Sequence, residues 1–451
     1  MESFRAASAG GRGARRPRPA RHRGRTAAGA VVSALAAVAL TALTGAAPAS
    51  GTEQTAAQGA VQGTAQGGVQ EPAPLGAGPD TKAAVRTAAP SGRGGGPGTV
   101  LSAEPTSFQY WPGVPTDTSA WKITYRSTSA DGRPNAVSGT VLVPHDGRSG
   151  PRPLITYAVG TVGMGDQCAP SSGFPDGTTT EAPLINAALV RGYAVAVTDY
   201  EGLGTPGDHT YTVARAEATA VLDAARAAQR LPGARERGVG PRSPVGIMGY
   251  SQGGQASAKA AEIAAWYAPG LDVRGTASGG VPADLTQVAE ASDGGDNAGF
   301  VLMSAIGHDA AFPGLHLEKY LNAEGRRLTE SARDACASEI LRAAEGRRID
   351  DLTVTNPLRR PDWRFRIAAD TLGRRAPAAP TFVYHGEADE VVPYAQGQGL
   401  RADWCARGNA VSFRSFPGSN HVGTAVAGNG PALAWLGDRF AGEPAPDDCP
   451  A

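Results

Sequence analysis

Gly249-Tyr250-Ser251-Gln252-Gly253 follows a short apolar run at 245–248 and opens an alanine-rich stretch at 255–266. This order predicts a strand, a sharp turn and a helix, with Ser251 on the turn. In such a nucleophile elbow, glycines two residues before and two after the serine let the strand and the helix approach closely. Because the chain contains 61 glycines, G-x-S-x-G alone could also mark an ordinary glycine-rich turn. Ser251 is therefore a candidate nucleophile that needs partners.

The segments around this elbow alternate between strand and helix patterns. Near-continuous apolar runs at 154–159 and 193–197 are typical of strands buried on both faces. Further strands are expected at 245–248, 273–277, 381–384 and 411–416, and helices at 181–191, 214–231 and 255–266. Alternation at 121–126 and 136–143 around Asp131-Gly132 predicts an antiparallel hairpin at the sheet edge. This order predicts an α/β fold with a mostly parallel, doubly wound sheet.

The strand and helix rhythm stops between about 281 and 380. The residues there are expected to form a helical cap, inserted over the carboxyl end of the sheet where open α/β folds bind ligands. The whole of 106–451 is then one domain with an insertion.

A candidate acid and base follow the elbow in chain order. Asp389 lies just after the predicted strand 381–384, and His421 follows the last predicted strand and is the only histidine beyond Asp389. A hydrolytic triad on such a sheet runs serine, acid, histidine, so Asp389 is expected to be the acid and His421 the base. Glu387 and Glu390 are expected to be solvated loop charges, and His385 to orient the loop or pack beneath it.

A serine nucleophile also needs donors for the oxyanion that forms on the substrate. One is expected to be the backbone N–H of Gln252, directly after the serine. The other should come from the loop after the strand that ends near Val159, where Thr161 in the run 160–163 is the candidate. A plain glycine-rich turn is the alternative there.

The N-terminal region is expected to direct export. Eight arginines between Arg5 and Arg25 precede an apolar run at 27–43 and an A-x-A site at 47–49, which predicts a signal peptide over 1–49. An uncleaved membrane anchor is the alternative, and the general secretory and twin-arginine routes both stay open. Residues 50–105, rich in Gly, Ala and Gln, are expected to be a disordered linker.

Charge and cysteine content exclude some functions. The chain has 42 basic and 42 acidic residues, and removal of the leader leaves 34 and 41, a net charge of −7. Without a basic stripe, nucleic-acid binding has no electrostatic support. In an exported protein the four cysteines favour two disulfides, and without a C-x-x-C spacing neither a metal site nor a redox pair is expected. No cofactor is implied. The cysteines are Cys168, Cys336, Cys405 and Cys449.

Taken together, several motifs resemble the secretory lipases of the fungal lipase A type, which have bacterial members. The resemblance rests on 125–127 with 136–141, 168–171, 198–204, 249–254 and 385–393, and it covers most of 106–438. It implies an α/β-hydrolase fold with a helical cap, and disulfides Cys168–Cys336 and Cys405–Cys449. One departure concerns the oxyanion loop, where many relatives have His-Gly and this chain has Val159-Gly160. Tyr200 and Gln252 would line the acyl pocket or pack beneath it.

The resemblance implies a secreted serine carboxylic-ester hydrolase, a triacylglycerol lipase that forms an acyl-serine intermediate. Its partner would be an ester or lipid, met at a lipid–water interface. The cap residues 300–303 and 305–306 would then provide an acyl pocket, or else form the cap's own core. A short-chain carboxylesterase, a peptidase of the same fold and a catalytically silent binding domain remain alternatives.

Overall fold

The computed structural model describes residues 95–148 and 150–450. The expected signal peptide 1–49, and the expected linker as far as residue 94, lie outside the described residues. The domain begins before the predicted boundary at 106, because Val100–Thr106 forms strand β1 and pairs with the strand Thr118–Thr128. Its side chains are largely exposed, so backbone pairing rather than an apolar pattern defines this strand.

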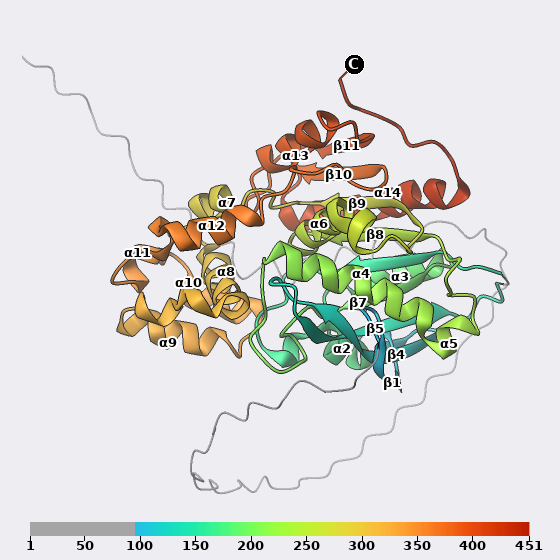
Figure 1. The fold of residues 1–451 in the computed structure, drawn as a ribbon, viewed down its shortest axis with the longest axis horizontal. Helices are drawn as coiled ribbons and strands as arrows, with labels where there is room; N and C mark the ends of the chain where they lie inside the picture. The colour runs from blue at the N-terminus through green and yellow to red at the C-terminus, as the bar shows by residue number, and fades with distance from the viewer. Residues whose placement is uncertain (1–94, 149, 451) are drawn as a thin grey trace, which may run out of the picture.

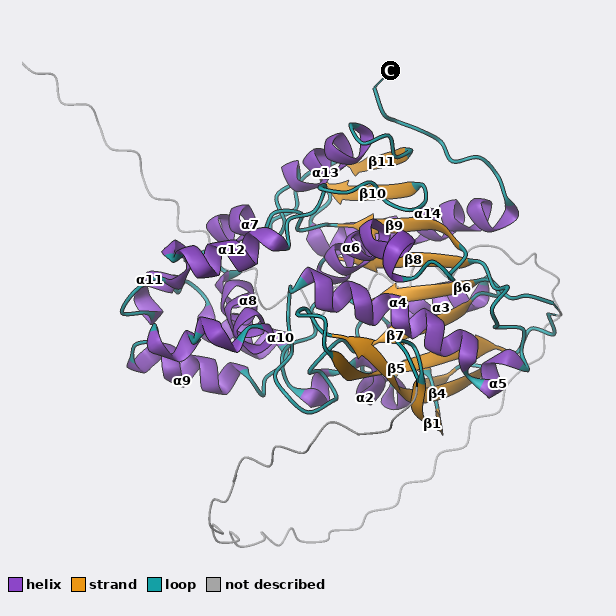
Figure 2. Cartoon of the chain, viewed as in Figure 1, coloured by secondary structure: helices purple, strands orange, loops and turns teal. Residues whose placement is uncertain are grey.

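Nine strands form one sheet in the order β1-β4-β5-β7-β6-β8-β9-β10-β11 (Figures 1 and 2). The six strands from β7 to β11 in this order are parallel, whereas β1, β4 and β5 are antiparallel. The predicted hairpin is present, but β1 lies outside it at the edge. The strands after β1 are β4 Thr118–Thr128, β5 Pro134–Pro144, β6 Leu154–Ala158, β7 Ala194–Thr198, β8 Val245–Tyr250, β9 Val273–Gly279, β10 Thr381–Gly386 and β11 Val411–Phe416, with a small separate pair β2 Gln109–Trp111 and β3 Val114–Pro115.

Helices cover both faces of the sheet, as a doubly wound fold requires. Helices α4 and α6 pack together on one face, where α13 shares an apolar cluster with α6, and α3 and α14 cover the other face. Every residue of β6, β7 and β8 is buried, which explains their continuous apolar sequences. These helices, with two short ones, are α2 Pro170–Gly173, α3 Ala182–Val190, α4 Ala214–Arg230, α5 Pro232–Arg235, α6 Gln252–Tyr267, α13 Ala395–Cys405 and α14 His421–Ala441.

Between β9 and β10 the chain forms a group of helices beside the carboxyl ends of the parallel strands, coloured yellow to orange in Figure 1. They have an apolar core of their own, which also takes in Met164 and Tyr211 from the sheet's loops. The cap helices are α7 Leu285–Ser292, α8 Ala298–Ala311, α9 Ala323–Ala332, α10 Ala337–Ala344, α11 Ile349–Leu352 and α12 Pro361–Ala369; short 3-10 turns are η1 Asp166–Cys168, η2 Phe174–Asp176, η3 Pro313–Leu315, η4 Leu317–Lys319 and η5 Pro357–Arg359.

Both expected disulfides are present. Cys168–Cys336 joins the loop after β6 to the cap, and Cys405–Cys449 joins the end of α13 to the C-terminal segment. Next to the first disulfide, Gly163 and Cys336 form an isolated antiparallel bridge. The cap is therefore attached to the loop that was expected to carry an oxyanion donor.

Candidate active site

Ser251 lies on the sharp turn between β8 and α6, as predicted. Its φ of 59° and ψ of −120° are strained for a residue with a side chain, and such strain concentrates at functional sites. The flanking glycines make this turn possible. A Cβ on Gly249 would lie 2.1 Å from the carbonyl oxygen of Gly253, and one on Gly253 would lie 1.9 Å from that of Ala158.

The structure brings the three expected catalytic side chains into one hydrogen-bonded chain. His421 Nε2 lies 2.9 Å from Ser251 Oγ, and His421 Nδ1 lies 2.7 Å from Asp389 Oδ2. Asp389 is on the turn after β10, while His421 is the first residue of α14 rather than part of a loop. The Asn420 side chain caps that helix by accepting from the Gly423 N–H. An order of serine, histidine and carboxylate like this one suits proton transfer from the serine.

The carboxylate of Asp389 is buried and well supplied with donors. Oδ1 accepts from the backbone N–H groups of Val391 and Val392, at 3.0 and 2.8 Å, and His385 Nε2 lies 3.4 Å from Oδ2. Burial alone would raise the pKa of Asp389, but hydrogen bonds from His385 and His421 outweigh it and hold this pKa well below its usual value. The group is therefore ionised and able to stabilise a His421 cation. His385 orients the loop, as expected.

The two neighbouring glutamates differ. Glu387 is exposed, as expected of a solvated loop charge. Glu390 is also exposed, but its Oε2 accepts from the backbone N–H of His421 at 3.0 Å. The interpretation of Glu390 as purely solvated is thus wrong, because the turn that presents Asp389 also directs Glu390 to the start of α14.

Two backbone N–H groups beside Ser251 have no acceptor among the described residues. One belongs to Gln252, at the start of α6, and the other to Thr161, on the loop after β6. The intervening Gly160 N–H is already used, since it donates to Glu181 Oε1 at 2.7 Å. A Cβ placed on Gly160 would lie 3.8 Å from Ser251 Cβ, so this loop runs against the nucleophile. These are the two N–H groups expected to be oxyanion donors, and within the described part of the chain both are free to donate to a substrate oxygen.

Glu181 was not found by sequence reasoning. It precedes α3, and its second oxygen accepts from the Tyr157 hydroxyl at 2.7 Å. Burial raises the pKa of Glu181, while hydrogen bonds from Tyr157 and Gly160 and the nearby His421 oppose the rise. In the sequence this glutamate looks like an ordinary polar residue before a helix, and only the folded chain places it against the glycine loop.

Tyr200 does not line the cavity described below. It is 1% exposed, and its hydroxyl donates to the Val159 carbonyl oxygen at 2.7 Å. Tyr200 therefore packs beneath the pocket and does not line it, because its hydrogen bond holds the ring under the loop after β6. Gln252, by contrast, is a cavity residue.

Ser251 lines a cavity of about 480 Å³ to which loops of the sheet and helices of the cap both contribute residues. Helix α8 supplies one wall and divides its apolar residues between two faces. Phe300, Val301 and Ala305 line the cavity, whereas Leu302, Met303 and Ile306 lie in the cap core, which Ala305 also joins. The apolar run 300–306 therefore serves both expected purposes, as the helical period allows.

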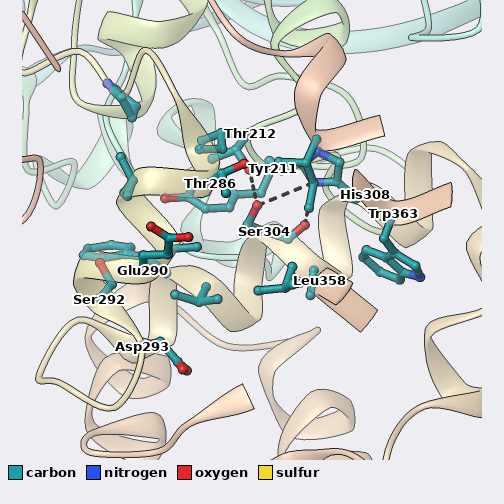
Figure 3. Close-up of a pocket in the computed structure, with 18 of the residues that line it drawn as sticks. Tyr211, Thr212, Thr286, Glu290, Ser292, Asp293, Ser304, His308, Leu358 and Trp363 are labelled. Carbon is teal, nitrogen blue, oxygen red and sulfur yellow. Dashed lines mark hydrogen bonds between the residues drawn. The ribbon is translucent and has the colours of Figure 1, made fainter. Parts of the chain in front are cut away.

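The cavity lining mixes apolar side chains with polar and charged ones, among them Glu290 and Arg364. On one side Thr212, Ser304 and His308 are hydrogen bonded (Figure 3). Among the described residues, no group of His, Cys, Asp and Glu is arranged to hold a metal ion. Within that same part of the chain, no helix is long and apolar enough to span a membrane.

A serine, a histidine and a buried carboxylate at the carboxyl end of a doubly wound sheet define an α/β hydrolase of the serine type. The sequence pattern of the secretory lipase family matches residues 175–448. The chain belongs to this family, so it is a secreted serine hydrolase of carboxylic esters.

Individual relatives agree with this family. The chain is 30% identical to a probable inactive lipase of Mycobacterium tuberculosis, over 78% of this chain and 80% of that one. It is 28% identical to a secreted triacylglycerol lipase of Malassezia globosa, over 73% and 74%. The crystal structure of Candida antarctica lipase A superposes with a TM-score of 0.71 at 25% identity, covering 78% of this chain and 84% of that one.

Proposed function

We propose that this protein hydrolyses acylglycerols through an acyl-enzyme on Ser251. The observation that carries the proposal is the hydrogen-bonded chain from Ser251 through His421 to Asp389, whose serine lines a cavity of about 480 Å³ together with apolar side chains of the cap. Secreted triacylglycerol lipases among the relatives support the same substrate class.

In the proposed reaction His421 Nε2 takes the proton of Ser251 as Oγ attacks the ester carbonyl carbon. The negative charge passes to the carbonyl oxygen, which accepts hydrogen bonds from the N–H groups of Gln252 and Thr161. His421 then gives its proton to the departing alkoxide, and the alcohol leaves. Water, deprotonated by His421, hydrolyses the acyl-serine and regenerates the enzyme.

The cavity supports a substrate with an apolar chain. Apolar side chains from α7, α8 and α12 form part of its lining, beside polar and charged ones, and burial of a CH₂ group contributes up to about 0.8 kcal/mol. A bound acyl chain would therefore gain affinity along the cap, while the ester stays beside Ser251. Access from a lipid–water interface fits this class of substrate.

A fluorophosphonate probe tests the chemistry, and ester hydrolysis tests the substrate class. The probe should label wild-type protein at Ser251 and leave Ser251→Ala unlabelled. The wild-type protein should hydrolyse both emulsified long-chain triacylglycerol and soluble short esters. Labelling without hydrolysis of long-chain emulsions would favour the short-chain carboxylesterase, and absence of labelling would favour a silent binding domain.

We further propose that export removes the leader after Ala49, so that the mature enzyme is free of the membrane. The alanine-rich run followed by an A-x-A site supports this. N-terminal sequencing of secreted protein would find residue 50 first. An N-terminus within the leader on membrane-bound protein would instead indicate the anchor.

A further inference from the structure

A buried glutamate on α4 holds the residue that follows the nucleophile. Glu217 is 0% exposed, and its Oε1 accepts from Gln252 Nε2 at 2.8 Å and from the backbone N–H of Thr212 at 2.9 Å. One oxygen thus joins three segments: α4, the loop before it and the first residue of α6. Its other oxygen is buried without a hydrogen-bond partner among the described residues.

His209 completes the support of the Gln252 side chain. His209 Nδ1 faces the Glu201 carbonyl oxygen at 3.0 Å, so it carries the proton, and Nε2 is left to accept from Gln252 Nε2 at 3.0 Å. Burial lowers the pKa of His209 to about 4, which keeps the ring neutral and able to accept. Both amide protons of Gln252 are therefore used, and its side chain has one orientation.

The same network reaches the cap through Thr212. Thr212 has a φ of 60°, a strained conformation for a β-branched residue, and its N–H is the one held by Glu217. Its hydroxyl donates to the Tyr211 carbonyl oxygen, so the hydroxyl of Ser304 on α8 must be the donor in the 2.7 Å contact with Thr212 Oγ1 (Figure 3). Gly307 lets α8 come this close, since a Cβ there would lie 2.4 Å from Tyr211 O.

We propose that Glu217 is a positioning residue for the oxyanion donor at Gln252, and that the contact of Thr212 with Ser304 makes this positioning depend on the seated cap. The proposal rests on the proposed function, because it assigns a role to a donor of that reaction. Glu217 touches no substrate, and its effect passes through the start of α6. A donor displaced by a fraction of an ångström stabilises the oxyanion poorly while ground-state binding is little changed.

Other ionisable groups lie near Glu217, but none of those named here is hydrogen bonded to Gln252. Tyr200 and Tyr211 are buried nearby, and burial keeps their pKa values far above neutrality. Asp370 is paired with His308 in the cap, with 3.1 Å between Oδ2 and Nε2, and it does not contact Gln252. Glu217 is the acidic residue whose carboxyl group is hydrogen bonded to the Gln252 side chain.

The test compares kcat and KM on a soluble ester, p-nitrophenyl butyrate, for variants of the full-length secreted enzyme. Glu217→Ala should lower kcat about 10- to 100-fold with KM changed less than about threefold, since removal of an entire donor costs 10²–10³. Glu217→Gln keeps an acceptor oxygen and should retain most of kcat. Asp223→Ala is the matched control: a buried carboxylate on the same helix, bonded to Ser127 and Tyr267, whose loss should lower Tm and leave kcat unchanged.

Gln252→Ala keeps the backbone donor and removes only its anchor, so it should reproduce the Glu217→Ala defect even if that variant folds poorly. Ser304→Ala should lower kcat by a smaller factor, and Ser304→Ala with Gln252→Ala should lose less than the product of the single effects, because both act on one element. Wild-type kcat in Gln252→Ala, or strictly multiplicative losses, would overturn the proposal. Those outcomes leave fluorophosphonate labelling of Ser251 intact, whereas failure of the proposed function removes labelling from the wild type.

Discussion

Ser251 owes its position to its backbone, so its hydroxyl can be removed without disturbing the elbow. Ser251→Ala should lower kcat on the order of 10⁶-fold, and His421→Ala by a similar factor, because the two groups act as one unit. The double variant should be no worse than either single one. Steady-state hydrolysis of p-nitrophenyl butyrate measures all three, and more than a tenth of wild-type kcat in either single variant would contradict the triad.

Asp389 offers a second residue-level prediction. Asp389→Asn should leave Tm nearly unchanged, because the amide oxygen can still accept the hydrogen bonds from Val391 and Val392. It should nevertheless lower kcat by several orders of magnitude, since it removes the charge that stabilises the His421 cation. Exposed Glu387→Gln serves as the control and should change kcat less than twofold. A severe defect in the control would mean that the acid has been assigned to the wrong carboxylate.

The ionisation of Glu217 gives a prediction for stability. Burial raises its pKa from 4.5 to about 8, against hydrogen bonds from Gln252 and Thr212. The folded protein therefore keeps the Glu217 proton at pH values where the unfolded chain, above pH 4.5, has released it. The contribution of this proton to the free energy of unfolding is full below pH 4.5 and is lost as pH rises through about 8. Glu217→Gln cannot ionise and should be more stable than the wild type at pH 9, with the gap closing at pH 5. Urea unfolding at the two pH values measures this, and an equal gap at both would contradict it.

At the scale of elements, helix α8 separates substrate binding from cap stability. Val301 faces the cavity, so Val301→Trp should fill it and shift the preferred p-nitrophenyl ester toward acetate and butyrate, with little loss of Tm. Leu302 faces the cap core, and Leu302→Ala should lower stability by about 2–5 kcal/mol without changing chain-length preference. If both variants change the preference for ester chain length equally, the cavity face and the core face of α8 are not independent.

Elements with a strong local signal were predictable and those without one were not. The largely apolar strands β6, β7 and β8 follow from local sequence because both of their faces are buried, and the elbow at Ser251 follows from its flanking glycines. Strand β1 was missed because its residues are exposed and only its pairing with β4 defines it. Glu181 and Glu217 were missed because a carboxyl group enclosed by the fold, just before a helix or within one, has the same local sequence as a solvated one. Their roles depend on contacts between distant segments.

For the whole molecule, each of the two disulfides should add several kcal/mol to the stability of the exported protein. They close segments of 168 and 44 residues, for which the chain-entropy model gives about 5 and about 4 kcal/mol. Cys405→Ser with Cys449→Ser should lower stability but spare kcat. Cys168→Ser with Cys336→Ser should lower both, because this disulfide joins the cap to the loop of Thr161. Thermal melts and turnover of the two double variants, taken together, check the distinction.

The attachment of the cap also determines how substrate can enter. The cap is continuous with the sheet where the chain leaves β9 and where it returns at β10, and Cys168–Cys336 joins it again to the loop after β6. A body held by its two chain connections and again by a disulfide cannot swing about a single hinge. We therefore expect the entrance to open by bending of α7 and α12, whose residues line the cavity, while α9 and α10 beside the disulfide stay still. Substrate would then enter through local movement of two helices, and most of the cap would keep its place on the sheet throughout turnover.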